Sequence, residues 1–100
     1  MLIVAGTITF DATKRSEAEA AFDKVRAATL KEPGCRDYQA YLDRKSAGVM
    51  FLFEKWDGPE ALASHFKTPH MAEFMTAMGG LGVTGMDIKR YEVSSEGPMM

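Results

Sequence analysis

The feature that most constrains this chain is a run of eight residues, VMFLFEKW at positions 49–56, that is apolar on both sides. Its β-branched and aromatic residues, bounded by polar turns, predict a strand. Since side chains alternate across a strand, Met50 and Leu52 share one face. Phe51 and Phe53 share the other. A sheet with one face in water carries polar residues at every second position, so the sheet that contains this strand must be covered on both faces.

The other segments predict three more strands. They are expected at 2–10, 35–42 and 83–93, where β-branched and aromatic residues cluster. The first of them repeats the two-sided pattern, with one face formed by Leu2, Val4, Ile8 and Phe10 and the other by Ile3, Ala5 and two threonines.

The first predicted helix lies between the strands at 2–10 and 35–42. Its apolar stripe has helical spacing and consists of Ala18, Ala21, Phe22, Val25 and Thr29. Ser16 and Glu19 have the spacing of a capping box, which predicts where the helix begins. Pro33-Gly34 is expected to stop it.

A second helical region, divided by Pro69, follows the strand at 49–56. Asp57 is expected to cap a short helix that runs through Phe66. Pro69 begins the next helix, and Gly79-Gly80 ends it. The apolar residues of this helix have i, i+3, i+4, i+7 spacing and are Met71, Phe74, Met75 and Met78.

The predicted order of elements is β-α-β-β-α-β, which is the ferredoxin-like α+β arrangement of an antiparallel sheet with its helices on one face. One hundred residues fit a single domain, expected over 1–93, with a loose C-terminal tail at 94–100. Because the helices can cover only one face of the sheet, we expect a second copy of the chain to cover the other and to form a homodimer.

Composition excludes several classes of partner. The formal net charge is −2 and the charges are interspersed, so the chain has no basic stripe for nucleic acid. The apolar start at 2–5 is too short to cross a membrane or to act as a signal segment. Cys35 is the only cysteine, which excludes an intrachain disulfide and suits a reducing cytoplasm. Cys35 itself is expected to be a small buried residue and not a nucleophile, because no basic cluster activates it.

Four polar or amphipathic residues occur at positions where the pattern is apolar. Glu54 and Trp56 share a strand face with Met50 and Leu52. His65 lies on the apolar stripe of the short helix, which Leu62 and Phe66 form. Histidine and glutamate in apolar surroundings are typical general bases. An indole ring offers a flat wall for an aromatic ligand. The second histidine, His70, stands just after Pro69.

Structural interpretations of the same residues stay open. His65 could be a hydrogen-bonded core residue, and His70 could simply close the turn that precedes its helix. Glu54 could pair with Arg90 on the last strand, and Trp56 could anchor the end of its own strand. The methionines, Met75 included, could fill the core.

Metal and nucleotide sites have no support in the motifs. His65 and His70 are five residues apart with Pro69 between them, so the i, i+4 pair of a helical zinc site is absent. No glycine-rich fingerprint follows a strand, and no GxSxG or P-loop motif occurs. We therefore expect no bound metal and no nucleotide cofactor.

Several short pieces of the chain occur together in one order and spacing: Glu32-Pro33-Gly34-Cys35, Tyr38, Glu54-x-Trp56, Leu62-x-x-His65 and Thr68-Pro69-His70. In this combination they resemble the antibiotic biosynthesis monooxygenase domain, over nearly the whole chain from Leu2 to Val93. The stretch from Glu54 to Met71 is similar to the quinol monooxygenase branch of that family.

The resemblance implies a dimeric α+β barrel. For several members it implies oxygenation of quinols or polyketide anthrones without flavin, haem or metal. It implies His65 as the base or proton relay, with His70 as the second choice. Residues implied to bind a small phenolic substrate are Trp56, Glu54, Phe66, Tyr38, Met75 and Arg90.

One departure narrows the reaction. Haem-degrading relatives use an Asn-Trp-His set, and some polyketide oxygenases also use an asparagine, whereas this chain contains no asparagine. Haem degradation is therefore not expected, and the anthrone mechanism does not transfer intact. Two other functions stay open on the same scaffold: an isomerase or decarboxylase that moves protons without O₂, and a non-catalytic dimer that binds a small aromatic metabolite.

Overall fold

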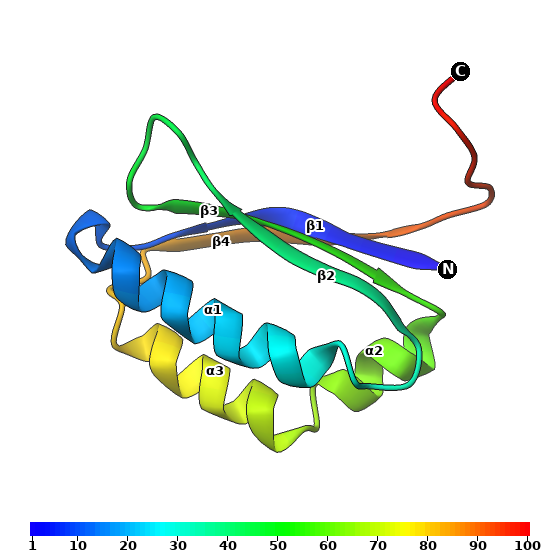
Figure 1. Cartoon of the computed structure of the whole chain (residues 1–100), viewed down its shortest axis with the longest axis horizontal. Helices are drawn as coiled ribbons and strands as arrows, with labels where there is room; N and C mark the ends of the chain where they lie inside the picture. Colours follow the sequence, from blue (N-terminus) through cyan, green and yellow to red (C-terminus); the bar gives the residue numbers. More distant parts are fainter.

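The computed structural model describes all residues from 1 to 100. Its elements, shown in Figure 1, are β1 (Leu2–Thr9), the 3₁₀ turn η1 (Ala12–Lys14), α1 (Arg15–Thr29), β2 (Cys35–Leu42), β3 (Val49–Trp56), α2 (Pro59–His65), α3 (Pro69–Gly79) and β4 (Gly85–Glu92). The strands predicted at 35–42 and 49–56 have the expected bounds. β1 and β4 are shorter than the strands predicted at 2–10 and 83–93, and β4 begins at Gly85 instead of residue 83.

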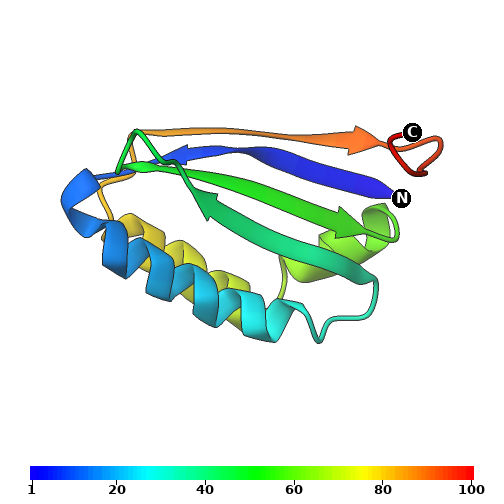
Figure 2. The ribbon, with the colours of Figure 1, turned by 45° about the horizontal axis from the view of Figure 1, so that its top comes forward.

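The four strands form one antiparallel sheet in the order β2-β3-β1-β4. β1 lies in the interior of the sheet between β3 and β4, so that Val4 is opposite Glu54 on one side and Arg90 on the other. All three helices lie on the same side of the sheet, as Figure 2 shows. The predicted ferredoxin-like α+β arrangement is confirmed.

The core lies between this sheet and its helices. The face of β1 that carries Ile8 and the face of β3 that carries Met50 are both buried there, with these two residues exposed by 1% and 2%. The helix stripe packs against them through Phe22 and Val25. The ring of Phe22 stacks on that of Tyr38 at 5.4 Å between centroids, which ties α1 to β2.

The opposite face of the sheet has no helix over it (Figure 2). It is nevertheless apolar, as the strand pattern predicted. Ile3, Ala5 and Phe53 are half-buried among their neighbours, while Phe51 and Tyr41 are 41% and 57% exposed. This face is called the open face below.

Two predicted helix caps are wrong. α1 begins at Arg15, and its N-cap residue Lys14 makes no side-chain cap, so the box of Ser16 and Glu19 does not form. The chain turns earlier instead, because the Asp11 carboxylate accepts a hydrogen bond from the Thr13 backbone N–H at 2.9 Å. Because α1 begins at Arg15, Ser16 lies inside the helix and not at its N-cap position.

The cap of the short helix is also displaced. Gly58, and not Asp57, is the N-cap of α2, and it offers no side chain. Asp57 forms an ion pair with Arg36 instead. For α3 the start at Pro69 and the end near Gly80 are confirmed.

Beyond β4 the chain has no helix or strand, although Glu96 reaches back to form an ion pair with Lys55 at 2.6 Å. None of the helices combines the length and the apolar character that a membrane crossing requires.

Candidate active site

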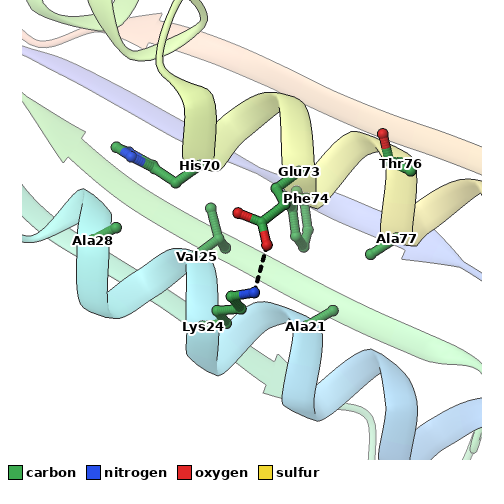
Figure 3. A pocket seen from close by; sticks show the side chains of 9 residues that line it. All are labelled: Ala21, Lys24, Val25, Ala28, His70, Glu73, Phe74, Thr76 and Ala77. Carbon is green, nitrogen blue, oxygen red and sulfur yellow. Dashed lines mark hydrogen bonds and ion pairs between the residues drawn. The ribbon is translucent and has the colours of Figure 1, made fainter.

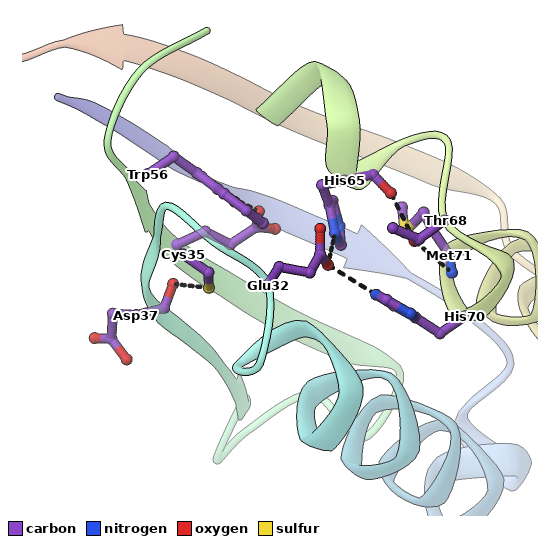
Figure 4. A network of polar contacts seen from close by, with 9 residues as sticks. Glu32, Cys35, Asp37, Trp56, His65, Thr68, His70 and Met71 are labelled. Atoms are coloured by element: carbon purple, nitrogen blue, oxygen red, sulfur yellow. Dashed lines mark hydrogen bonds and ion pairs between the residues drawn. The ribbon is translucent and has the colours of Figure 1, made fainter. Parts of the chain in front are cut away.

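A cluster of one carboxylate and both histidines lies where the ends of three helices meet (Figure 4). Oε2 of Glu32 is 2.7 Å from Nδ1 of His65 and 2.7 Å from Nε2 of His70. The His65 side chain is 1% exposed, that of Glu32 11% and that of His70 23%. The carboxylate therefore bridges a fully buried ring and a partly exposed one.

Gly34 positions the loop that carries Glu32. It has φ +86°, in the left-handed region that favours glycine. A Cβ at this position would lie 2.6 Å from the Cβ of Ala61 on α2. The Gly34 carbonyl also accepts a hydrogen bond from the Asp57 backbone N–H at 2.8 Å. The loop is thus held against α2, the helix that carries His65.

The two histidines are placed by the break between α2 and α3. His65 is the last residue of α2, and His70 is the second residue of α3. Thr68 joins the two helix ends, because its hydroxyl donates to the His65 carbonyl at 2.7 Å and accepts from the Met71 backbone N–H at 3.2 Å. Pro69 then supplies the preset φ of a first helical position.

This geometry fixes the tautomer of each neutral ring. A carboxylate oxygen can only accept, so His65 must donate from Nδ1 and His70 from Nε2. Nε2 of His65 then keeps its lone pair, and it makes no hydrogen bond within the chain. A carboxylate that holds one imidazole nitrogen and leaves the other free is the usual orientation of a catalytic histidine.

Aromatic rings enclose His65. Its centroid lies 4.8 Å from that of Trp56, 5.5 Å from that of Tyr38 and 5.6 Å from that of Phe66. These contacts restrict the rotation of the imidazole, so that packing and the Glu32 hydrogen bond select the same orientation.

A second buried carboxylate, that of Glu54, lies on the neighbouring strand β3. Its Oε1 accepts a hydrogen bond from the Trp56 indole N–H at 3.0 Å. The pKa of Glu54 is raised to about 7, chiefly by burial and in smaller part by the negative charge of Glu32, while the hydrogen bond from the indole N–H opposes the shift. Near neutral pH this carboxyl is therefore present in both its protonated and its ionised form, so it can either donate or accept a proton.

A cavity of about 400 Å³ lies between the sheet and the helices α2 and α3. It is mostly apolar, and its walls include Val4, Ile8, Leu52, Leu62, Phe74, Ile88 and the methionines at 71, 75 and 86. The buried wall contributes three ionisable side chains, those of His65, Glu54 and Tyr38. Lys89 and Arg90 line the cavity from the exposed edge strand β4. A small aromatic molecule has a volume suited to such a cavity.

Six of the eight predicted site residues line this cavity: His65, Glu54, Tyr38, Phe66, Met75 and Arg90. Phe66 and Met75 are 61% and 50% exposed, so they form its rim and not the core filling that remained open for Met75. Arg90 makes no ion pair with Glu54, so the alternative pairing of these two residues is not formed.

Trp56 and His70 do not line the cavity. Trp56 is 0% exposed and packs behind His65, so it supports the imidazole and does not stack on a ligand. His70 instead lines a groove between α1 and α3 on the outer side of the helices (Figure 3). The Lys24–Glu73 ion pair spans this groove.

Cys35 lies near both carboxylates and is half-buried. Burial raises the pKa of its thiol to about 11, and the charges of Glu32 and Glu54 act in the same direction. The thiol is thus protonated at neutral pH, which agrees with the expectation that Cys35 is not a nucleophile.

Glu32 is a residue of this cluster that the sequence did not indicate as a site residue. It lies in a loop, in the segment Glu32-Pro33-Gly34-Cys35 that contributes to the family resemblance. Its role depends on a contact across 33 residues, which no local pattern shows. The donor atoms of Glu32, His65 and His70 all lie within 4.8 Å of one another, so this cluster is also a candidate set of metal ligands.

Comparison with known proteins places the chain in a family. A profile described as antibiotic biosynthesis monooxygenase matches residues 1–77. An uncharacterised protein of Synechocystis is 31% identical over 93 residues, which are 93% of this chain and 63% of that protein. Rv0793 of Mycobacterium tuberculosis, named as a candidate monooxygenase, is 33% identical over 67 residues, which are 67% of this chain and 65% of that protein. The chain thus spans less than two thirds of the length of these relatives.

The fold agrees with this placement. The structure of a candidate antibiotic biosynthesis monooxygenase from Deinococcus radiodurans matches with a TM-score of 0.91 and 27% identity, covering 100% of this chain and 99% of that one. With the profile match over most of its length, this chain belongs to the antibiotic biosynthesis monooxygenase family.

Proposed function

We propose that the protein is a monooxygenase that oxidises a quinol or a similar small phenol with O₂, and that His65 is its general base. The observation that carries the proposal is the position of His65. It lines an apolar cavity of about 400 Å³, and Glu32 holds its Nδ1 while Nε2 has no partner in the chain. The family and its candidate monooxygenase members support an oxygenase reaction.

The proposed reaction begins with proton transfer. Nε2 of His65 takes the proton of a phenolic hydroxyl, and Glu32 stabilises the imidazolium that forms. The resulting phenolate is electron-rich enough to pass an electron to O₂. For a p-quinol the balance is one quinol and one O₂ giving one hydroxyquinone and one water, with one oxygen atom entering the ring.

The remaining walls suit an aromatic substrate. Phe66 and Met75 at the rim can contact the ring, since aromatic and thioether groups adapt to flat apolar surfaces. Tyr38 offers a hydroxyl that makes no hydrogen bond within the chain, and burial raises the pKa of this hydroxyl, so it stays a donor. Arg90 on β4 can pair with a partial negative charge that develops on the substrate oxygen.

We further propose that a second copy of the chain covers the open face. The apolar residues there come from three neighbouring strands, and Phe51 at their centre is 41% exposed. A sheet-to-sheet contact would bury them and enlarge the modest core of a 100-residue chain. Sedimentation at micromolar concentration tests this point: Phe51→Asp should convert a dimer to an 11 kDa species, and a wild type that sediments only at 11 kDa contradicts it.

Oxygen uptake tests the reaction. A panel of reduced quinones is supplied to the wild type, to His65→Ala and to Ser64→Ala, a matched change at an exposed position of the same helix. We expect uptake with at least one quinol, with ¹⁸O from ¹⁸O₂ in the product, and loss of uptake only in His65→Ala. Absence of uptake across the panel, or equal uptake by His65→Ala, contradicts the proposal.

A second candidate function is proton transfer without O₂, of the isomerase or decarboxylase type. The observation in its favour is that one cavity holds two groups suited to move protons, His65 and a Glu54 whose pKa is about 7. Such an enzyme would catalyse deuterium exchange at a carbon next to a carbonyl, in anaerobic buffer, and would consume no O₂. Quinol binding with neither reaction would instead indicate a non-catalytic binding protein.

A further inference from the structure

The cluster of Glu32, His65 and His70 contains one more histidine than the proposed reaction uses. A base requires one histidine and one orienting carboxylate, yet Glu32 contacts both histidines of the chain through the same oxygen. The second histidine, His70, does not line the substrate cavity. We propose that these three side chains form a binding site for a divalent transition metal ion such as Zn²⁺ or Co²⁺.

The donor set fits this class of ion. Two imidazole nitrogens and one carboxylate oxygen are the ligands of many zinc sites, with a fourth position left open. Nitrogen donors also favour Zn²⁺, Co²⁺ and Ni²⁺ over Mg²⁺ and Ca²⁺, which prefer oxygen. The i, i+4 spacing that His65 and His70 lack is required only of two zinc ligands within one helix. The structure brings the two rings together from the ends of two helices, and a loop supplies the third ligand.

Metal binding requires all three side chains of the cluster to move. Tetrahedral ligands about 2.1 Å from zinc lie roughly 3.4 Å from one another. Here each nitrogen is 2.7 Å from the carboxylate oxygen, and all three donor atoms fall within 4.8 Å. The two ring nitrogens must approach one another by about 1.4 Å, and the Glu32 oxygen must move back by roughly 1.7 Å, to give the required spacing. Glu32 is in a loop, so its side chain is the part of the cluster that can adjust most.

Access comes from the side opposite the substrate cavity. His70 lines the groove of about 470 Å³ between α1 and α3, and its side chain is 23% exposed (Figure 3). Glu73 lines the same groove, where its charge is paired with that of Lys24. A cation can thus reach the cluster without passing through the apolar cavity.

Metal binding also changes the state of His65. In the hydrogen-bonded cluster the proton is on Nδ1, whereas a metal bound at Nδ1 requires the proton on Nε2. The neutral ring accommodates this by changing tautomer, with no net loss of a proton. Nε2 would then be a donor and not an acceptor, so the metal-bound site and the proposed base are alternative states. The binding itself does not depend on the proposed reaction.

Cobalt absorption tests the proposal directly. Co²⁺ is titrated into the untagged full-length protein, and the visible d–d band of a site with nitrogen ligands is measured. The chain has two histidines and one cysteine, so few other soft ligands compete. We expect saturation at one Co²⁺ per chain, displacement by Zn²⁺ and no displacement by Mg²⁺.

Matched variants decide which residues bind. His70→Ala and Glu32→Gln should each abolish the band, while Glu73→Gln, one turn further along α3, and Cys35→Ser should retain it. Circular dichroism of each variant checks that it is folded. The proposal is overturned if the wild type gives no band, or if a folded His70→Ala retains the band at the wild-type affinity.

Discussion

Two buried glutamates near one cavity have opposite environments. Glu32 is in a loop and accepts hydrogen bonds from two imidazole rings at 2.7 Å, whereas Glu54 is on a central strand and accepts one from an indole at 3.0 Å. Only Glu54 lines the cavity. Burial and the charge of Glu32 raise the pKa of Glu54 to about 7.

The difference separates two roles for the same chemical group. A carboxylate that accepts hydrogen bonds from two rings can hold a neighbouring ring in one orientation. A carboxyl with one hydrogen-bond donor in an apolar wall has a pKa close to neutral pH and can exchange a proton there. We therefore interpret Glu32 as a positioning residue and Glu54 as a proton-holding residue.

The largest expected effect on turnover comes from replacing His65, the residue that Glu32 orients. His65→Ala should lower turnover of a quinol by about 10²- to 10⁴-fold, because it removes the proposed general base. Steady-state rates of oxygen uptake measure the effect. Ser64→Ala on the same helix serves as the control, and an unchanged rate in folded His65→Ala would remove this residue from the mechanism.

Glu54→Gln tests the other half of the comparison through stability. A carboxyl with an ordinary pKa of 4.5 and a folded-state pKa of about 7 is protonated in both states at low pH, so its burial costs nothing there. As the pH rises from about 4.5 to about 7, the folded state loses up to about 3 kcal/mol of stability. The uncharged glutamine keeps an acceptor for Trp56 and avoids this loss.

The variant should therefore unfold at higher denaturant concentration than the wild type above pH 7, with the difference disappearing below about pH 4.5. Urea unfolding at several pH values measures it. The exposed Glu60→Gln is the control. A wild type whose stability relative to Glu54→Gln does not change with pH would show that Glu54 is solvated.

Glu32→Gln should have a smaller effect on rate, of about 10- to 100-fold, since supporting partners of functional histidines have effects of this size. The loss should fall on kcat and leave KM nearly unchanged, because Glu32 does not line the cavity. Steady-state assays over a range of quinol concentrations separate kcat from KM. A change confined to KM would show that Glu32 contacts the substrate.

The smallest expected effect comes from Thr29, the last residue of α1, whose buried hydroxyl has no hydrogen-bond partner. An unpaired hydroxyl costs less to bury than an unpaired carboxylate. Thr29→Val should stabilise the fold by about 1 kcal/mol, without dependence on pH. Thermal unfolding measures it, and a destabilised variant would indicate that the hydroxyl is hydrogen-bonded.

The fold was largely predictable from sequence because its signals are local. The alternation of Met50 and Phe51 on β3 predicted a sheet with two apolar faces, and Pro69 predicted the break between two helices. The cap predicted at Ser16 is wrong because the turn capped by Asp11 lets the helix begin before Ser16, at Arg15. The cap predicted at Asp57 is wrong because Asp57 pairs with Arg36 and Gly58 takes the N-cap position. These outcomes are decided by three-dimensional placement.

The site was predictable only in part for the same reason. His65 and Glu54 stood out because polar residues on apolar faces are unusual. Trp56 was expected to form a wall of the ligand site. Its side chain is instead fully buried in the core and packs behind the imidazole of His65. Glu32 gave no pattern of its own, since its function arises from a loop that Gly34 allows to approach α2.

The central claim is that Glu32 fixes His65 with its proton on Nδ1 and its free lone pair on Nε2. Long-range ¹H–¹⁵N NMR of the metal-free protein at about pH 8, where ordinary histidines are neutral, reads this tautomer directly, and the chain has only two histidines to assign. We expect the Nδ1–H tautomer for His65 and the Nε2–H tautomer for His70. An Nε2–H tautomer for His65 would contradict it, because that ring could neither donate to Glu32 nor accept a proton from a substrate in the cavity.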